Sequence, residues 1–355
     1  MVNPEFWRGK RVFLTGHTGF KGGWLSIWLH RLGAEVTGFA LPPPTAPSLF
    51  ASAGVEGLLH STLGDIRDAE ALTAALTAAD PDIVFHLAAQ PLVGDSYRDP
   101  VGTYATNVTG TLNLLQAARQ APRLGAVVVV TTDKCYENRE TKTPYREGDA
   151  LGGHDPYSSS KACAEILTHA WRRSFFHTEG AARIASARAG NVIGGGDWAE
   201  HRLVPDLLRA YAAGETARLR HPGSIRPWQH VLEPLSGYLT LAERLYDNRI
   251  DERAWNFGPP LADCISVGDI ADLLASYWPT PAAWQAVPSE LPHEAGVLML
   301  DASLAQKKLQ WRPRWPLSEA LRRTAEWHLA WMEGQDMYAI STGQIDAYAQ
   351  RPDSL

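Results

Sequence analysis

A tyrosine and a lysine four positions apart are the residues of this chain that most directly suggest chemistry. They are Tyr157 and Lys161, in the stretch Tyr-Ser-Ser-Ser-Lys. Residues i and i+4 of a helix lie on one face, so the phenol and the ammonium are expected side by side. A fixed cation lowers the pKa of a phenol from about 10 toward neutral pH, which makes Tyr157 a candidate base for a hydroxyl group. The default explanation of such a pair is an exposed helix face, so support must come from elsewhere in the chain.

Polar residues at the end of an apolar run give part of that support. Thr132, Asp133 and Lys134 follow the stretch 126–131, Ala-Val-Val-Val-Val-Thr, which predicts a buried strand. Residues at the carboxyl ends of parallel strands face the crevice in which ligands bind. A solvated pair at a strand end is the common explanation for Asp133 and Lys134, but it is a poor one beside a tyrosine–lysine pair.

A glycine-rich turn follows the first predicted strand, at 11–15. Its sequence is Gly-His-Thr-Gly-Phe-Lys-Gly, from Gly16 to Gly22. Gly16 allows a tight turn, Gly19 lets the backbone approach a pyrophosphate, and Gly22 lets helix and strand pack closely. The N-terminus of the following helix then faces the phosphates. Such a spacing is weak alone, but its place in an alternating α/β chain makes it a strong indication of a dinucleotide site. His17 either contacts a phosphate or fills the turn.

The usual acidic residue for the cofactor ribose is missing from this chain. The second predicted strand runs into Leu41-Pro42-Pro43-Pro44, where a Rossmann site would carry a carboxylate about 20 residues after the glycines. No arginine stands there for a 2′-phosphate, so NAD is favoured over NADP. We therefore expect NAD to be bound loosely and partly lost on purification. Asp65 could accept a bond from the adenine amino group or be an ordinary turn carboxylate.

The order of apolar runs predicts a doubly wound Rossmann-type parallel sheet of the α/β class. Strands are expected at 11–15, 34–40, 83–87, 126–131 and 183–188, and helices up to about 32, at 101–119 and at 156–176. After Asn191 the pattern changes, which predicts a smaller α+β substrate-binding domain. We assign 1–190 and 231–262 to the dinucleotide-binding domain, and 191–230 and 263–355 to a nucleotide-sugar-binding domain.

Composition excludes several classes of protein. The chain has 355 residues, 45% of them hydrophobic, and a net charge of −6 without a basic run, which argues against a nucleic-acid surface. No apolar stretch is long enough to span a membrane, and the start does not resemble a secretory signal. Three scattered cysteines indicate a reducing compartment, which predicts a cytoplasmic protein. The 12 histidines show no metal-ligand spacing, so no metal is expected.

Taken together, these motifs resemble the extended short-chain dehydrogenase/reductases, and within them the nucleotide-sugar 4,6-dehydratases that act on CDP-glucose. The resemblance covers about two-thirds of the chain, and the Asp-Lys and Pro-Trp-Gln-His stretches are its most specific parts. One departure is Gly94-Asp95, where relatives commonly carry a basic residue; Arg98 is a possible substitute. The stretches that carry the resemblance are Gly16–Gly22, His86–Val93, Thr132–Tyr136, Tyr157–Lys161, Gly190–Trp198 and Arg226–Pro234.

The resemblance implies a redox-neutral reaction with NAD as cofactor. Tyr157 would take the proton of the sugar 4-hydroxyl while hydride passes from C4 to NAD, and Thr132 would bond the 4-oxygen. Lys161 would orient the nicotinamide ribose and hold down the pKa of the phenol. The 4-ketone acidifies the C5 hydrogen, a base removes it, water leaves from C6, and the hydride returns to C6. The protein supplies positions and proton transfers.

The two central residues, Asp133 and Lys134, conflict in this scheme. Asp133 would be the acid for the departing 6-hydroxyl, and Lys134 stands where related dehydratases have a glutamate base. An acid needs a raised pKa, whereas an adjacent ammonium lowers it. Either Lys134 is neutral and acts as the C5 base, or it stays charged and stabilises the enolate while another group removes the proton.

The resemblance also assigns binding residues and an assembly. Asn191 and Arg226 would hold the nucleotide diphosphate, although a turn residue and a solvated arginine are the plain explanations. The helices at 101–119 and 156–176 would form a homodimer, with a tetramer left open. A nucleotide-sugar 4-epimerase and a catalytically silent NAD-binding sensor are the alternatives. The predicted NAD contacts are Gly16, His17, Gly19, Phe20, Gly22, Asp65, Ile66, Leu87, Ala88, Ala89, Tyr157 and Lys161.

Overall fold

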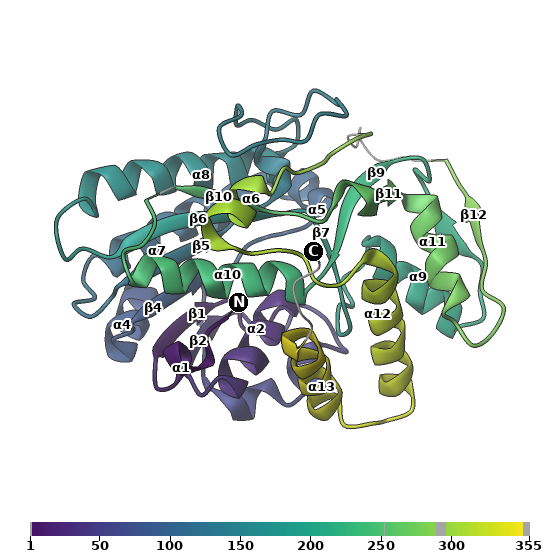
Figure 1. Ribbon diagram of the computed structural model, residues 1–355, viewed down its shortest axis with the longest axis horizontal. Coiled ribbons are helices and arrows are strands. Elements are labelled where there is room, and N and C mark those ends of the chain that lie inside the picture. Colours follow the sequence, from purple (N-terminus) through teal and green to yellow (C-terminus); the bar gives the residue numbers. More distant parts are fainter. Residues whose placement is uncertain (1, 252, 289–295, 351–355) are drawn as a thin grey trace.

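A seven-stranded parallel sheet forms the centre of the computed structural model, which describes residues 2–251, 253–288 and 296–350 (Figure 1). The strand order is β10-β6-β5-β4-β1-β2-β3. Strands β2 and β3 are added on one side of β1 and the later strands on the other, so the topological switch point lies between β1 and β4. The predicted doubly wound Rossmann-type sheet is confirmed. Its strands are β1 (Arg11–Thr15), β2 (Glu35–Ala40), β3 (His60–Leu63), β4 (Ile83–His86), β5 (Ala126–Val130), β6 (Arg183–Ala189) and β10 (Ala254–Phe257).

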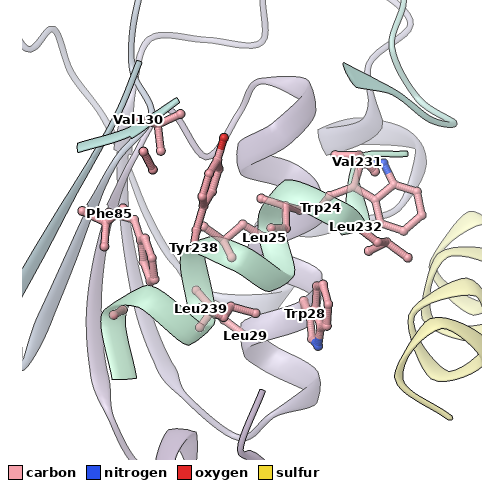
Figure 2. Close-up of a cluster of buried hydrophobic side chains, with 14 of the residues drawn as sticks. Trp24, Leu25, Trp28, Leu29, Phe85, Val130, Val231, Leu232, Tyr238 and Leu239 are labelled. Carbon is pink, nitrogen blue, oxygen red and sulfur yellow. The ribbon is translucent and has the colours of Figure 1, made fainter. Parts of the chain in front are cut away.

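Helices cover both faces of this sheet because its strands are apolar on both sides. Phe13 of β1 packs into a core formed with α4, α7 and α8, whereas its neighbours Val12 and Leu14 pack with α2 and α10 on the other face. Figure 2 shows this second core, with Trp24 and Leu239 among its side chains. The helices of this part are α1 (Pro4–Trp7), α2 (Phe20–Arg31), α3 (Leu49–Ser52), η1 (Val55–Leu58), α4 (Ala69–Ala79), α5 (Val93–Arg98), α6 (Pro100–Tyr104), η2 (Ala105–Thr109), α7 (Gly110–Ala118), η3 (Asp133–Cys135), α8 (Pro156–Phe175) and α10 (Leu232–Tyr246).

A smaller α+β region lies beside the carboxyl ends of the strands (Figure 1). It contains a three-stranded sheet, β11-β9-β7, and a two-stranded sheet, β12-β8. The last helix, α13, packs back on α2 of the large sheet. The domain boundaries that we assigned stay a prediction. The elements are β7 (Asn191–Ile193), α9 (Leu203–Ala212), β8 (Ala217–Leu219), β9 (Ile225–His230), η4 (Leu261–Asp263), β11 (Cys264–Ser266), α11 (Val267–Ser276), β12 (Trp284–Ala286), η5 (Ala305–Leu309), α12 (Leu317–Met332) and α13 (Met337–Gln350).

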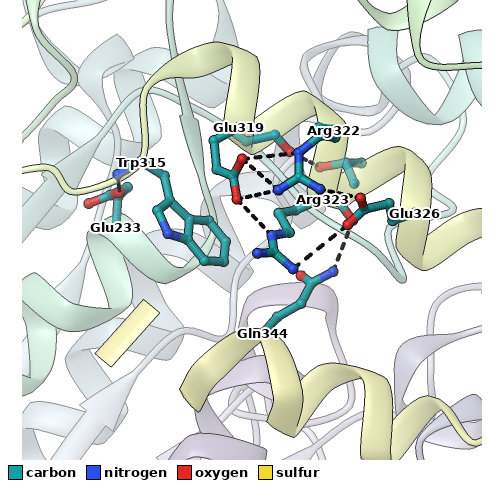
Figure 3. A network of polar contacts seen from close by, with 9 residues as sticks. Glu233, Trp315, Glu319, Arg322, Arg323, Glu326 and Gln344 are labelled. Carbon is teal, nitrogen blue, oxygen red and sulfur yellow. Dashed lines mark hydrogen bonds and ion pairs between the residues drawn. The ribbon is translucent and has the colours of Figure 1, made fainter. Parts of the chain in front are cut away.

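Glu233 at the start of α10 fastens the C-terminal segment to the core. Its buried carboxylate accepts from the backbone N–H of Trp315 at 2.7 Å, from that of Arg314 at 3.0 Å, and from the Tyr348 hydroxyl at 2.6 Å. Figure 3 shows Glu233 against Trp315, with the ion-pair network of Glu319 and its arginines farther along α12. One carboxylate thus satisfies donors from two segments more than 80 residues away in sequence.

We expect Glu233→Ala to lower the free energy of unfolding by about 3 kcal/mol, because it leaves three buried donors without an acceptor. Denaturant unfolding measures this change. Glu319→Ala is the matched control, since its pairs with Arg322 and Arg323 are partly solvated and should cost less than about 1 kcal/mol. Equal losses of unfolding free energy in the two variants would contradict this stabilising role of Glu233.

Candidate functional site

Helix α8 carries the tyrosine and the lysine on its first two turns. Asp155 caps the helix by accepting from the backbone N–H of Ser158 at 2.9 Å, and Pro156 occupies its first position. Tyr157 and Lys161 are both buried, and the Lys161 ammonium donates to the carbonyl oxygen of Val130, at the end of β5, at 3.3 Å. The pair therefore faces the carboxyl end of the sheet rather than solvent.

Burial dominates the electrostatics of this pair. It raises the pKa of Tyr157 to about 12, against the lowering effects of the Thr132 hydroxyl and the charge of Arg202. Burial also lowers the pKa of Lys161 to about 8, although the carboxylate of Glu165 acts in the opposite direction. The shift of the phenol is therefore opposite to the one expected from its neighbouring cation. In the chain alone, Tyr157 holds its proton.

Asp133 lies on η3, one residue beyond Thr132. Asp133 is 2% exposed, and the Thr132 hydroxyl donates to its Oδ1 at 3.0 Å. Burial raises the pKa of Asp133, while Lys134, Thr132 and Arg226 act to lower it. Desolvation thus outweighs the lowering effect of Lys134 on the pKa of Asp133. A raised pKa is the direction that suits a carboxyl group to act as an acid.

A buried ion pair holds α8 in place behind the reactive groups. Glu165 lies one turn beyond Lys161, and Arg188 of β6 donates to its carboxylate at 2.8 Å. Ser186 donates to the same carboxylate at 2.6 Å, and Thr131 also donates to it. Both charged side chains are 3% exposed. Because these bonds join α8 to β5 and β6, they fix the position of the helix relative to Thr132 and Asp133.

The glycine-rich turn fits the diphosphate of a dinucleotide. Gly16 has a φ of +79°, and a Cβ there would lie 2.7 Å from the backbone nitrogen of Ala88. A Cβ at Gly22 would lie 2.0 Å from the carbonyl oxygen of Gly16, so helix and strand meet without space for a side chain. No side chain caps α2 at Gly19, which leaves the N–H groups of its first turn for an anion.

The second predicted cofactor loop lies against this turn. The backbone N–H groups of Leu87 and Ala88 both donate to the Thr15 hydroxyl at 3.2 Å. His86 is buried between the hydroxyls of Thr15 and Thr111, and burial lowers its pKa to about 3, so it is neutral. The structure thus brings 87–89 beside 16–22 at the carboxyl ends of β1 and β4.

Other predicted cofactor residues are engaged within the protein. The His17 ring bonds the Ser61 hydroxyl at 2.8 Å, and burial lowers its pKa to about 4, so it fills the turn as a neutral group. Asp65 accepts from the backbone and guanidinium of Arg67, the arrangement of a turn carboxylate. Ile66 is buried against Gly110 of α7. Contacts of these three residues with NAD stay a prediction.

The substrate side meets the catalytic side at Asp133. Arg226 on β9 is buried, and its charge acts on Asp133. Asn191 begins β7 and pairs in register with Trp228. A Cβ at the preceding Gly190 would lie 3.0 Å from Asp133 Oδ2, so the chain passes directly beside the acid. By contrast, Arg98 is paired with Asp95 on α5.

Two cations near the site were not predicted. Lys21 on the first turn of α2 has its pKa lowered to about 8 by burial and by Arg202 and Lys161, with Asp133 and Asp197 opposing. Arg202 is paired with Asp197 at 2.9 Å. A lysine in a glycine-rich turn, where the helix dipole disfavours a cation, was the available signal for Lys21. For Arg202 the sequence carries no comparable signal.

Within the described residues, no three metal-ligating side chains lie together, and no helix is long and apolar enough to cross a membrane. A family model described as "NAD dependent epimerase/dehydratase family" matches residues 12–258. The chain belongs to this family. Its cofactor is accordingly NAD. That the glycine-rich turn holds this cofactor stays a prediction, with which the turn's geometry agrees.

Two sequence relatives place the chain within the epimerase/dehydratase family. It is 50% identical over 353 residues to a CDP-glucose 4,6-dehydratase of Salmonella typhimurium, with 98% of each chain covered. It is 26% identical over 295 residues to a dTDP-glucose 4,6-dehydratase of Shigella flexneri, which covers 76% of this chain and 79% of the relative.

Solved structures of the epimerase/dehydratase family share the fold. A dTDP-glucose 4,6-dehydratase from Streptomyces venezuelae, solved with NAD, superposes with a TM-score of 0.78 at 24% identity, over 92% of this chain and 99% of that one. A UDP-glucose 4-epimerase from Stenotrophomonas maltophila, also with NAD, has a TM-score of 0.79 at 22% identity over 92% and 99%. Both reactions therefore occur on this scaffold, and fold alone does not choose between them.

Proposed function

We propose that this protein is a CDP-glucose 4,6-dehydratase, a lyase of deoxysugar biosynthesis that forms CDP-4-keto-6-deoxyglucose. The observation that carries the proposal is the buried Asp133, with its raised pKa, beside Thr132 and Tyr157. An acid in this place serves the departure of water. The 50% identity to a CDP-glucose 4,6-dehydratase, over 98% of both chains, supports the same reaction and the same nucleotide.

The residues divide the proton transfers among them. Tyr157 removes the proton of the sugar 4-hydroxyl, which Thr132 holds by a hydrogen bond. Lys134 removes the proton at C5 of the 4-ketone, and Asp133 gives its proton to the departing 6-hydroxyl. Lys134 gives the proton back to C5 when C6 receives the hydride. Bound NAD supplies the acceptor and later the donor of one hydride, so the reaction is redox-neutral. Lys161 orients the cofactor ribose.

Arg226 and Asn191 are proposed to hold the nucleotide diphosphate. Both lie on the sheet β11-β9-β7, beside the acid, and the planar guanidinium of Arg226 suits bidentate contact with a phosphate. The distance between these two diphosphate-binding residues and Tyr157 then determines which carbon of the sugar lies at the phenol.

A 4-epimerase on the same scaffold is the second candidate, because epimerases superpose on this chain as well as dehydratases do. Epimerisation needs a base at the 4-hydroxyl but no acid at C6. Asp133 has no role in epimerisation. A silent NAD-binding sensor would need none of the four residues Thr132, Asp133, Tyr157 and Lys161. The buried acid therefore favours dehydration.

Mass spectrometry of the sugar nucleotide after incubation with NAD tests the proposal. We expect CDP-glucose to lose one water without net NADH, while the UDP, GDP and dTDP equivalents stay unchanged. Unchanged mass in every sample would rule out dehydration. A product of equal mass but altered retention would indicate the epimerase.

We also propose a cytoplasmic homodimer. Val101 on α6 is 78% exposed and Ile166 on α8 is 58% exposed. Tyr104, the last residue of α6, has its hydroxyl 2.7 Å from that of Ser159 on α8. Such apolar side chains on adjacent helices suit a four-helix interface between two copies. Light scattering of the purified protein is expected to give twice the mass of the chain. A monomer at micromolar concentration would contradict the dimer.

A further inference from the structure

A tyrosine of α10 ends close to the catalytic acid without taking part in the proposed reaction. Tyr238 is 0% exposed, and its ring packs edge-on against Phe257 with the centroids 5.6 Å apart. Figure 2 shows its ring rising from α10, with the hydroxyl directed toward the end of β5 near Val130. Among the residues that the structure describes, no side chain or backbone group bonds this hydroxyl.

A hydroxyl in such a place is not explained by packing. Burying a polar group without a partner costs free energy, and buried tyrosine hydroxyls ordinarily have one. Phenylalanine would keep the contact with Phe257 and avoid that cost. We therefore expect this hydroxyl to form a hydrogen bond with a group that is not part of the polypeptide.

Asp133 carries the complementary feature. Its Oδ1 accepts from Thr132, but its buried Oδ2 has no partner in the described part of the chain. The Tyr238 hydroxyl is near enough for the charges of Asp133 and Tyr157 to act on it. A buried donor and a buried acceptor thus stand unpaired within electrostatic reach of each other.

The surrounding backbone places the Tyr238 hydroxyl and Asp133 Oδ2 at the carboxyl ends of the strands of the large sheet. Phe257, against which Tyr238 packs, pairs in register with Ala189, and the next residue, Gly190, lies beside Asp133 Oδ2. Gln229 adds a third group here: its amide donates to the carbonyl of Phe257 at 2.8 Å, and its buried Oε1 has no partner in the described structure. A buried water needs two to four such polar partners.

We propose that Tyr238 is a positioning residue for the catalytic acid, and that its hydroxyl holds a water molecule which donates a hydrogen bond to Asp133 Oδ2. In the chain alone the Thr132 hydroxyl donates to Oδ1. When that hydroxyl turns to the sugar 4-oxygen, as proposed above, Oδ1 loses this donor, and the water on Oδ2 leaves the acid proton on Oδ1 for the departing 6-hydroxyl. After the proton has passed to the departing hydroxyl, the same water stabilises the carboxylate. Tyr238 itself neither gains nor loses a proton.

Substitution by phenylalanine tests this role, which rests on the proposed dehydration. A donor to Oδ2 favours the carboxylate and lowers the pKa of Asp133, so Tyr238→Phe should raise it further. Because the acid must be protonated, the basic limb of the kcat profile should move to higher pH. We expect kcat to fall about 10-fold with KM nearly unchanged, since the acid proton is no longer directed to Oδ1. The other groups whose charges act on Asp133 or respond to it all remain in the variant; they are Lys21, Lys134, Cys135, Tyr157, Arg226 and Cys264.

The matched control is Tyr211→Phe, which removes a buried hydroxyl bonded to the carbonyl of Ala271 at 3.2 Å, away from Asp133. It should lower Tm slightly and leave kcat and the pH profile unchanged, whereas Tyr238→Phe should keep or raise Tm.

A carbon NMR titration of Asp133, assigned with Asp133→Asn, gives the pKa of Asp133 without turnover. An equal pKa of Asp133 in Tyr238→Phe and the wild type would overturn the inference, even if CDP-glucose proved not to be the substrate. Failure of the wild type to dehydrate CDP-glucose would instead overturn the proposed function.

Discussion

The Tyr157→Phe variant is expected to fold normally and to lose about 10³-fold in kcat, the contribution typical of a positioned acid–base group. The cap of α8 is formed by Asp155 and Pro156, and the ion pair of Glu165 and Arg188 holds the helix to the sheet. None of these depends on the phenol, so Tm should change little. Product formation followed by mass spectrometry, together with a thermal scan, measures both effects.

The pH dependence gives a second test of the same residue. Burial raises the pKa of Tyr157 to about 12, so the deprotonated phenol becomes more abundant as pH rises. The titration of Asp133 is common to the wild type and Tyr157→Phe, so the ratio of their kcat/KM values isolates the phenol. This ratio should increase between about pH 6 and about pH 8. Tyr246→Phe, at the far end of α10, is the control and should behave as wild type. A Tyr157→Phe variant that keeps a tenth of the kcat would exclude the phenol as the base.

The sequence predicted the parts of the fold that rest on continuous apolar runs or on backbone geometry. The residues of β4 and β5 are all buried, and their apolar runs, ended in β4 by His86, were readable without the structure. The glycine-rich turn was equally readable, because Gly16 and Gly22 stand where no side chain fits. Strand β3 was not predicted, because it lacks such an apolar run. His60–Leu63 is an edge strand with largely exposed side chains, so it shows no apolar pattern.

Helix 101–119 shows a limit of a different kind. The structure has α6, a π-helical turn η2 at Ala105–Thr109, and α7 in succession, whereas the periodicity predicts one regular helix. The extra residue of a π-turn is set by what the helix packs on, and Asn107 in this turn bonds Ser160 of α8 at 2.9 Å and Gln90 at 3.0 Å. Contacts between distant segments decided this detail.

The candidate site divides in the same way. Thr132, Asp133, Tyr157 and Lys161 were predicted together because strand ends of a parallel sheet converge, and the structure places them there. Lys21 and Tyr238 reach the site from α2 and α10, on the other face of the sheet. Lys21 stands within the glycine-rich motif but was not singled out, and no local motif indicates Tyr238. The direction of the Tyr157 shift was mispredicted because spacing reveals a neighbouring cation but not the burial that outweighs it.

The roles of Asp133 and Lys134 can be separated by hydrogen exchange at C5 of the substrate. Asp133→Asn should lower the formation of dehydrated product about 10²-fold or more, because water no longer has a proton donor when it leaves C6. Removal of the C5 proton precedes that step and does not use the carboxyl group. Deuterium from D₂O should therefore still enter C5 of the recovered substrate.

Lys134→Met should lose both exchange and product by about 10²-fold, if the lysine is the C5 base that we propose. Lys134→Arg is the informative control, because arginine keeps the charge but does not accept a proton at working pH. Loss of exchange in both variants identifies a base; recovery in Lys134→Arg identifies a charge that stabilises the enolate. Unimpaired exchange in Lys134→Met would exclude the lysine from proton removal and direct the search to another group. In each case Asp133 acts in the step that follows the exchange, and burial shifts its pKa upward, the direction that this role requires.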